Sequence, residues 1–269
     1  MNHFFFIGSC VGIGVLSGFS GGLLGIGGGV IIVPLLIVLL DLLAFLPADD
    51  VTAVAVATSL ACVLFTSLSA ALAQMRARMV DWDIVRRWAP FLIGGSFLSG
   101  WVATALPVLV FRGFIGLLLL FVAFVMLTRW RPSPQHQPPG LGLSALLGGA
   151  GGLASGMAGI GGGNVVVPTL IYFNVPVHRA TATSSTLGVP IALAGLLGYV
   201  SVGIGQDLGD GMVGYLYVPG FLAIVSAAVV MAPLGVKVAH AVAAQPLRRA
   251  FGILLVLVSG RMLYSAWLG

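Results

Sequence analysis

The sequence predicts an all-α membrane protein that crosses the bilayer several times and is built from two related halves. Of its 269 residues, 59% are hydrophobic and only 7% are charged, whereas a soluble domain carries about 25% charged residues. Mean hydropathy is +1.14. A surface in water needs charged side chains. This composition therefore excludes an ordinary soluble domain and predicts an apolar surface that faces lipid.

Apolar segments follow one another along the whole chain. A membrane helix needs about 20 apolar residues, and windows of that length identify segments at 4–24, 28–46, 51–73, 88–107, 110–128, 141–158, 162–176, 181–204, 214–235 and 250–268. The first segment lacks the basic start of a signal peptide and continues past any sensible cleavage site. The segment 162–176 is short for a crossing. We therefore predict eight to ten membrane segments, in which the first pair of each half forms either full spans or a re-entrant hairpin.

The two halves are separated by a linker and resemble each other. Residues 129–140 combine prolines with polar residues that end helices, and they divide the chain into a first membrane repeat, 1–128, and a second, 141–269. The stretch GIGGGVIIVP at 25–34 recurs as GIGGGNVVVP at 159–168, and AVAVATSL at 53–60 parallels ATATSSTL at 180–187. Two matches in the same order indicate an internal duplication. An odd number of segments in each half predicts that the second repeat is inverted, as in many secondary transporters.

The placement of basic residues predicts the orientation in the membrane. Basic residues follow the third, fifth, seventh and ninth segments, whereas aspartates follow the second and the eighth. The positive-inside rule then places the basic loops and the linker in the cytoplasm and the N-terminus on the periplasmic side of a bacterial inner membrane. The arginines form no basic stripe with interleaved aromatic residues, so we expect no nucleic-acid partner.

The glycine motifs predict a binding site in the middle of the membrane. Each glycine costs about 1 kcal/mol relative to alanine inside a helix, so contiguous glycines should break it. Such a break is tolerated in hydrocarbon only where it is buried in protein or lines a watery cavity. The apolar sequence that resumes at Val30 and Val165 predicts two new helices, whose N-terminal N–H groups carry partial positive charge and can bind an anion. Close helix packing is the alternative explanation for the glycines.

Runs of Ser and Thr in the segments 51–73 and 181–204 are candidates to complete the coordination of the anion. They can donate to a ligand, or they can hydrogen-bond back to their own helix. The predicted substrate-binding residues are Gly25, Gly27, Gly28, Gly29, Thr58, Ser59, Gly159, Gly161, Gly162, Gly163, Asn164, Thr183, Ser184 and Ser185. The copies differ where the second has Asn164 and the first has Val30. Because asparagine is a favoured N-cap whose amide can also donate, we expect the second copy to contribute more to binding.

The remaining polar residues predict neither catalysis nor a cofactor or metal. The stretch GFSG at 18–21 matches the local pattern of intramembrane serine proteases. The four histidines fall near segment ends or in loops, however, so Ser20 lacks a base. Cys10 and Cys62 have no cysteine partner at short spacing, which indicates neither a disulfide framework nor a metal site.

Three charged residues lie close to apolar sequence. Arg261 falls well inside the last segment and is either functional or extends to the outer interface, and Arg112 is expected at the interface for the same reason. Asp41 is the one acid near apolar sequence. A coupling ion, H⁺ or Na⁺, would therefore depend on backbone carbonyls, hydroxyls or Asp41.

The repeated Gly-Ile-Gly-Gly-Gly-x-hydrophobic-Pro stretch, followed in each half by Ala-x-Ala-Thr-Ser, resembles the TauE/SafE family of sulfite and organosulfonate exporters. The resemblance covers residues 4–268 and implies an inner-membrane permease for sulfur-containing anions such as sulfite, sulfoacetate or thiosulfate. It also implies functional roles for the glycines of both motifs and for Asn164. We therefore expect a secondary transporter, in the direction of export, that works by alternating access around a midplane site. A passive anion channel and a non-transporting membrane assembly protein are the alternatives, and a homodimer is compatible with the sequence.

Overall fold

The computed structural model describes residues 3–24, 28–43, 46–128, 140–206, 208–241 and 244–268. These ranges contain α1 (His3–Leu24), α2 (Gly29–Leu43), α3 (Ala48–Arg76), α4 (Trp82–Ala105), α5 (Val108–Thr128), α6 (Leu141–Ala158), α7 (Gly163–Tyr172), α8 (Val177–Gly203), β1 (Met212–Val213), β2 (Leu216–Tyr217), α9 (Val218–Ala241) and α10 (Ala244–Leu268). Each predicted apolar segment overlaps one helix, so the predicted all-α membrane fold is confirmed. Most of the predicted linker, 129–139, lies outside the described residues.

The short β-hairpin between α8 and α9 is a feature that apolar content did not predict. The expected segment started at residue 214, but α9 starts at Val218, and Met212 pairs antiparallel with Tyr217. Gly211 and Gly214 have φ angles of 79° and 54°, in the left-handed region that glycine enters readily. Gly214 lies in the turn between the two strands, and Gly211 directly precedes β1. A short apolar run does not by itself distinguish strand from helix.

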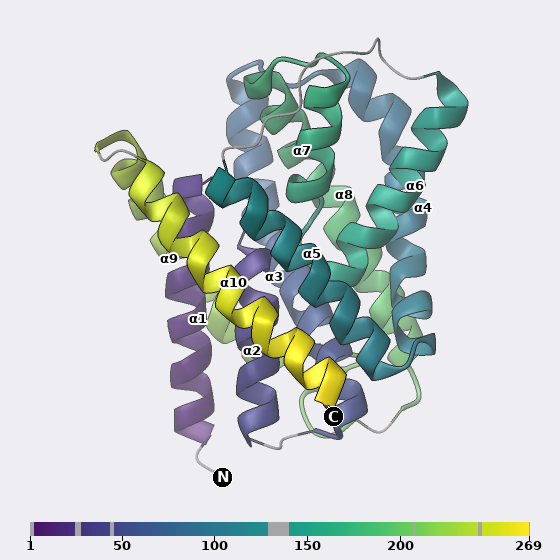
Figure 1. The fold of residues 1–269 in the computed structure, drawn as a ribbon, viewed down its shortest axis with the longest axis vertical. Coiled ribbons are helices and arrows are strands. Elements are labelled where there is room, and N and C mark those ends of the chain that lie inside the picture. The colour runs from purple at the N-terminus through teal and green to yellow at the C-terminus, as the bar shows by residue number, and fades with distance from the viewer. Residues whose placement is uncertain are drawn as a thin grey trace.

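Among the residues that the structure describes, four helical stretches are long and apolar enough to cross a bilayer, namely Ala48–Arg76, Val108–Thr128, His178–Gly203 and Val218–Gly235. By contrast, α2 has 15 residues and α7 has 10. At 1.5 Å per residue these lengths correspond to about 22 and 15 Å, against about 30 Å for the hydrocarbon core. In Figure 1, α2 stays in the lower part of the molecule and α7 in the upper part. Helices α2 and α7 are therefore each too short to cross the hydrocarbon core in a straight span, whereas the 22 residues of α1 are long enough.

Matching helices of the two halves make matching contacts. Helix α1 packs against α9, and its counterpart α6 packs against α4. Gly18 of α1 lies directly against the backbone of Ala228, and Gly152 of α6 lies in the same way against the backbone of Leu92. Each first helix of one half is therefore packed on the fourth helix of the other half.

Helices α5 and α10, the fifth of each half, pack against each other, and their contacts show in which directions they run. A β-carbon added to Gly116 would lie 3.0 Å from Leu263 Cγ, and one added to Gly252 would lie 2.8 Å from Leu127 Cγ. The start of each helix thus meets the end of the other, so the two helices are antiparallel, and they cross on the front of the molecule (Figure 1). These paired contacts support the prediction of an inverted repeat.

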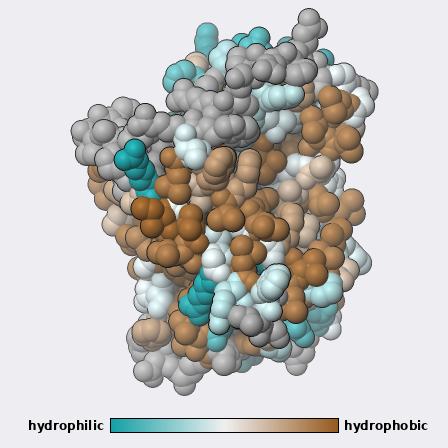
Figure 2. Space-filling view, in the orientation of Figure 1, coloured by the Kyte–Doolittle hydropathy of each residue, from teal (hydrophilic) through white to brown (hydrophobic). Residues whose placement is uncertain are grey.

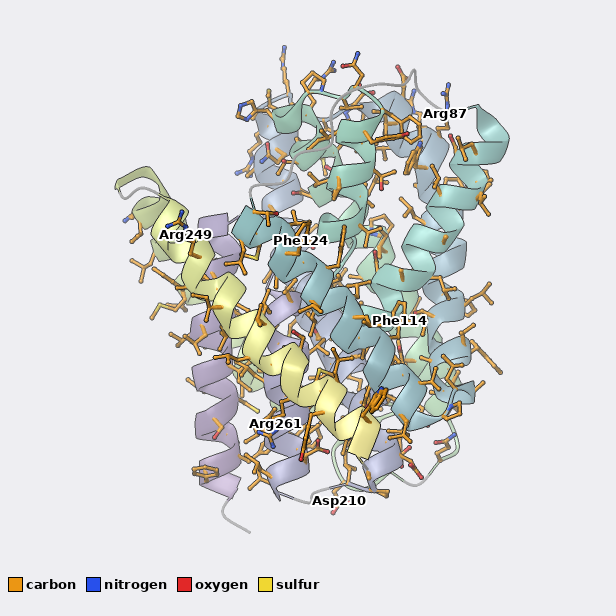
Figure 3. The ribbon with its side chains drawn as sticks, in the orientation of Figure 1. Arg87, Phe114, Phe124, Asp210, Arg249 and Arg261 are labelled. Atoms are coloured by element: carbon orange, nitrogen blue, oxygen red, sulfur yellow. The ribbon has the colours of Figure 1, made fainter. Side chains whose placement is uncertain are left out.

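The surface of the molecule has an apolar middle and polar ends. Figure 2 shows hydrophobic side chains across the middle of the face formed by α5 and α10, with hydrophilic residues toward the two ends. In Figure 3, Arg87 lies at the upper end and Asp210 at the lower end. Both ends of the chain lie at the lower side (Figure 1).

Candidate functional site

The second glycine motif forms the turn between α6 and α7. Gly159, which caps α6, has a φ of 67°, Gly161 has 63°, and Gly162, which caps the start of α7, has 84°. The left-handed region costs an L-residue about 1–2 kcal/mol. Three positions of this short turn therefore favour glycine strongly, and the predicted break in the helix is present.

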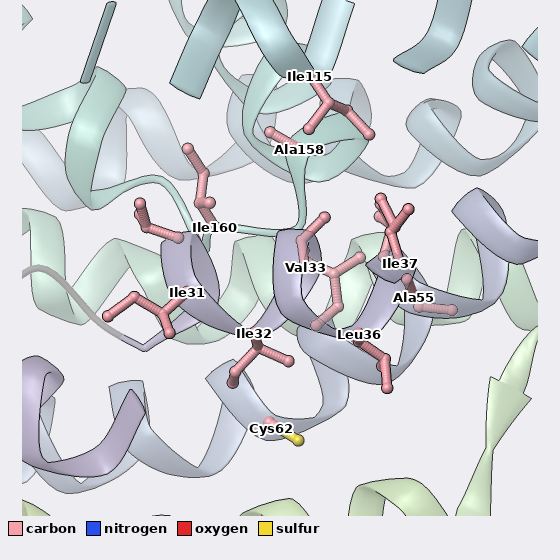
Figure 4. Close-up of a cluster of buried hydrophobic side chains, with 14 of the residues drawn as sticks. Ile31, Ile32, Val33, Leu36, Ile37, Ala55, Cys62, Ile115, Ala158 and Ile160 are labelled. Carbon is pink, nitrogen blue, oxygen red and sulfur yellow. The ribbon is translucent and has the colours of Figure 1, made fainter. Parts of the chain in front are cut away.

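The first glycine motif meets the second at the centre of the helix bundle. Gly29, the first residue of α2, packs directly against the carbonyl oxygen of Gly159, and its β-carbon position lies 3.0 Å from Ile160 Cα. Figure 4 shows Ile160 beside the first turns of α2, which carry Ile31 and Val33. We call this contact between the α6–α7 turn and the start of α2 the glycine junction. Gly25 and Gly27 lie outside the described residues, as does the side chain of Asn164.

Both short helices begin at the glycine junction. The first backbone hydrogen bonds of α2 run from Ile31 and Ile32 to the Gly28 carbonyl oxygen, at 3.0 and 3.1 Å. Those of α7 run from the residues at 165 and 166 to the Gly162 carbonyl oxygen, at 3.1 and 2.8 Å. The N–H groups that precede them have no acceptor within their own helix and carry partial positive charge. The junction therefore brings together two helix N-termini, as the sequence predicted.

One predicted hydroxyl stabilises the glycine junction itself. Ser59 Oγ in α3 donates to the Gly159 carbonyl oxygen at 2.8 Å, and both groups are buried. This bond pairs a carbonyl that the end of α6 would otherwise leave without a partner. The Ser59 side chain thus contacts the backbone of the predicted site.

The two predicted threonines make corresponding contacts in the two halves, although the sequence alignment does not pair them. Thr58 Oγ1 in α3 accepts from the N–H of Tyr217, the residue before α9, at 3.2 Å. Thr183 Oγ1 in α8 accepts from the N–H of Asp81, the residue before α4, at 3.0 Å. Each threonine therefore joins its helix to the start of the fourth helix of the other half. Their role as substrate ligands stays a prediction.

The other two predicted hydroxyls of α8 divide between the two alternatives. Ser185 Oγ donates to the Thr181 carbonyl oxygen of its own helix at 2.9 Å. Ser184 Oγ is buried and, within the part of the chain that the structure describes, has no hydrogen-bond partner. Ser185 thus follows the back-bonding alternative, whereas Ser184 keeps its donor available.

The buried polar side chains of the described residues are mostly serines and threonines, and buried tyrosines such as Tyr199 add phenolic hydroxyls. Three of them, Ser17, Ser67 and Ser155, were not predicted as site residues, although they lie beside the glycine junction. The signal that could have identified Ser155 is its spacing, since it lies four residues before Gly159 and therefore on the same helix face. Within the described ranges, no cluster of His, Cys, Asp or Glu could hold a metal ion.

The charged residues near apolar sequence lie away from the glycine junction. Arg112 Nη2 pairs with Asp41 Oδ1 at 2.9 Å, and Arg112 Nε donates to Thr52 Oγ1 at 3.0 Å, so this arginine joins α5 to α2 and α3. Asp41 is 12 residues beyond Gly29, or about 18 Å along the helix. Arg261 is exposed, as are Tyr264 and Trp267 further along α10. That position favours the interfacial alternative for Arg261.

The sequence of this chain also matches a known protein family. The family model described as sulfite exporter TauE/SafE matches residues 10–262 of this chain. The chain belongs to the sulfite exporter TauE/SafE family. It is therefore a multi-pass membrane protein of a transporter family.

Curated relatives of this TauE/SafE protein are named only in general terms. It is 29% identical over 261 residues to a "probable membrane transporter protein" of Haemophilus influenzae, covering 96% of this chain and 98% of that one. A "probable membrane transporter protein" of Bacillus subtilis is 28% identical over 276 residues, covering 94% and 96%. One from Methanocaldococcus jannaschii is 26% identical over 244 residues, covering 88% and 87%. No solved structure matches the chain.

Proposed function

We propose that this protein is a secondary transporter that exports sulfite or a related sulfur-containing anion by alternating access. The observation that carries the proposal is the glycine junction, where α2 and α7 both begin in the interior of the bundle. Helix N-termini bind sulfur and phosphorus oxyanions through backbone N–H groups without a charged side chain. That chemistry suits an interior whose described buried polar groups are hydroxyls. The family description supplies the substrate class.

The antiparallel arrangement of matching helices supports alternating access. A β-carbon on Gly195 of α8 would lie 3.0 Å from Leu60 Cδ1, and one on Gly188 would lie 3.0 Å from Ser67 Oγ. Residue numbers that increase along α8 thus lie against residue numbers that decrease along α3. These two helices are therefore antiparallel, like α5 and α10. Inverted halves around a central site can exchange conformations, which opens the site to each side in turn.

We also propose that the upper end in Figure 3, with Arg87, faces the cytoplasm and that the lower end, with Asp210, faces the periplasm of a bacterial inner membrane. Coupling to H⁺ or Na⁺ belongs to the same proposal. Labelling of single cysteines introduced at the two ends of intact cells would test the orientation. Imposed pH or Na⁺ gradients across proteoliposomes would test the coupling.

Transport by the purified protein in proteoliposomes is the direct test. We expect saturable flux of labelled sulfite, and counterflow driven by unlabelled sulfite on the opposite side. Flux without saturation or counterflow would indicate the channel alternative. Absence of flux with sulfite, thiosulfate, sulfoacetate and taurine would favour an assembly protein and refute the proposal.

Substitutions in the glycine motifs locate the site. Gly162→Leu should abolish flux, because φ is 84° there and a β-carbon would lie 2.5 Å from Ile191 Cδ1. Gly28→Leu should also abolish it, through the fixed contact with Ser17. Asn164→Leu should impair flux more than Val30→Leu, and equal activities would count against the asymmetry of the two copies.

A further inference from the structure

We propose that the protein holds one anion rather than two, at the N-terminus of α7, and that Ser155 donates a hydrogen bond to it. The inference rests on the proposed function and specifies which helix end binds and which side chain assists. It follows from three differences between the two ends that meet at the glycine junction. These are the atoms around each end, the hydroxyl beside it and the exposure of its first residue.

Two backbone carbonyl oxygens lie against the start of α2, beside the side chains of Ser17 and Val63. A β-carbon on Gly28 would lie 3.1 Å from the Ser17 carbonyl oxygen, and one on Gly29 would contact the Gly159 carbonyl oxygen. Both glycines are buried. Carbonyl oxygens carry partial negative charge, so they complement the positive helix end and repel an anion. They are held by the backbone of α1 and of the α6–α7 turn and cannot rotate aside, so an anion at this end would approach fixed oxygens that repel it.

Side chains, in contrast, border the start of α7. The atoms nearest to a β-carbon on Gly162 belong to Ile191, at 2.5 Å, and Val166, at 3.6 Å. Those nearest to one on Gly161 belong to Val63 and to Ser67 Oγ, the latter at 3.6 Å. None of these nearest atoms is a carbonyl oxygen.

The first residue of α7 is also more accessible than the first residue of α2. Gly163 is half-buried, whereas Gly29 is buried. The end of the Ile191 side chain can change rotamer, which a backbone carbonyl cannot do. The start of α7 can therefore admit an anion without unwinding a helix.

Ser155 is the hydroxyl beside this end. Its side chain is fully buried, at 0% exposure, and among the described residues its Oγ has no hydrogen-bond partner. Gly151, one turn earlier on the same face of α6, lies against Val165 in the first turn of α7, with a β-carbon distance of 3.5 Å. Because α6 and α7 form a hairpin, the next turn of α6 lies opposite the start of α7. Ser155 is in that turn.

The contacts between α6 and α4 also place Ser155 near the start of α7. A β-carbon on its neighbour Gly156 would lie 2.9 Å from Ser96 Oγ of α4. Ser96 Oγ in turn donates to the carbonyl oxygen of Ile191 at 2.7 Å, and Ile191 is the residue that covers Gly162. Ser155 therefore lies between α4 and the N-terminus of α7.

An unpaired buried donor is unusual, because most buried hydroxyls find a partner. A donor that no protein group occupies is available to an anion at the neighbouring helix end. The first half offers no equivalent, since the residue four positions before Gly25 is Gly21. An unpaired hydroxyl thus accompanies the start of α7, whereas Ser17, beside the start of α2, is bonded to the Gly14 carbonyl oxygen.

Isothermal titration of the purified full-length protein in detergent with sodium sulfite, and in parallel with thiosulfate and taurine, tests the inference. Ser155→Ala is compared with Ser17→Ala, whose hydroxyl donates to the Gly14 carbonyl oxygen of its own helix at 3.2 Å and whose β-carbon and carbonyl remain. We expect one bound anion per chain in the wild-type protein. Ser155→Ala should weaken its affinity about tenfold or more, since hydrogen bonds to charged groups are strong. Ser17→Ala should bind as wild type does.

Thermal unfolding without anion separates a ligand role from a structural one. Ser155→Ala removes a hydroxyl that has no partner, so its apparent Tm should equal or exceed that of the wild type. A lower Tm, wild-type affinity in Ser155→Ala, or two anions per chain would each overturn the inference while leaving the proposed transport in place. A wild-type protein that binds none of the three anions would refute the proposed function itself, and that result requires no variant.

Discussion

Alanine substitutions of two glycines in α6 give a quantitative test of how the halves pack. A β-carbon on Gly152 would contact the Leu92 carbonyl oxygen and lie 2.9 Å from Leu92 Cα, whereas one on Gly149 would meet nothing within 4 Å. Alanine gains about 1 kcal/mol in helix propensity at both positions, so this gain cancels in the comparison. The difference that remains is the cost of overpacking, because the backbones of α4 and α6 must separate. We therefore expect Gly152→Ala to have a free energy of unfolding about 1–3 kcal/mol lower than that of Gly149→Ala.

The same comparison in α1 tests the correspondence between the halves. Gly18→Ala would place a β-carbon 2.5 Å from Ala228 Cα in α9, whereas Gly12→Ala would meet nothing within 4 Å. We therefore expect Gly18→Ala to be less stable than Gly12→Ala by a similar amount.

Unfolding of the purified protein in mixed micelles by increasing fractions of SDS, followed by circular dichroism, measures both differences. A stability of Gly152→Ala equal to that of Gly149→Ala would refute the close approach of α4 and α6. A clear difference in α6 without one in α1 would refute the equivalence of the two packing contacts.

Three further substitutions test the glycine junction and the charged residues. Ser59→Ala removes the bond to the Gly159 carbonyl oxygen and should lower the free energy of unfolding by about 1–3 kcal/mol; unchanged SDS unfolding would contradict a structural role for that bond. Asp41→Asn weakens the pair with the partly exposed Arg112 and should cost no more than about 1 kcal/mol, with transport intact. Loss of ion-driven flux in Asp41→Asn would instead identify this carboxylate as the coupling group. Arg261→Gln should transport at the wild-type rate, and an inactive but folded variant would place Arg261 on the substrate pathway.

Several features of the fold could be predicted because their causes are local in the sequence. A bilayer requires about 20 apolar residues for each crossing, and contiguous glycines interrupt a helix wherever they occur. Helices therefore lie where the apolar segments predicted them, and the break at Gly159–Gly162 is present. The hairpin at Met212–Tyr217 was not predicted, because apolar content does not separate a strand from the start of a helix.

The candidate site was predicted less completely than the helices. Ser59 was predicted as a substrate donor, and the structure shows it bonded to Gly159. Ser155 was not predicted, because a serine inside a glycine-rich apolar helix resembles any other small packing residue. Its isolation from hydrogen-bond partners depends on which groups of α4 and α7 approach it.

By itself the amino-acid sequence determined that the chain belongs in a membrane and that a helix begins at each glycine motif, and it predicted two related halves. These properties follow from composition and spacing within short segments. The difference between the two helix ends arose from the packing of one half on the other, which sets the Gly159 carbonyl oxygen against Gly29 and leaves side chains around Gly162. These contacts join residues that are far apart along the chain. They form only when the helices pack together, so no local sequence pattern predicts them.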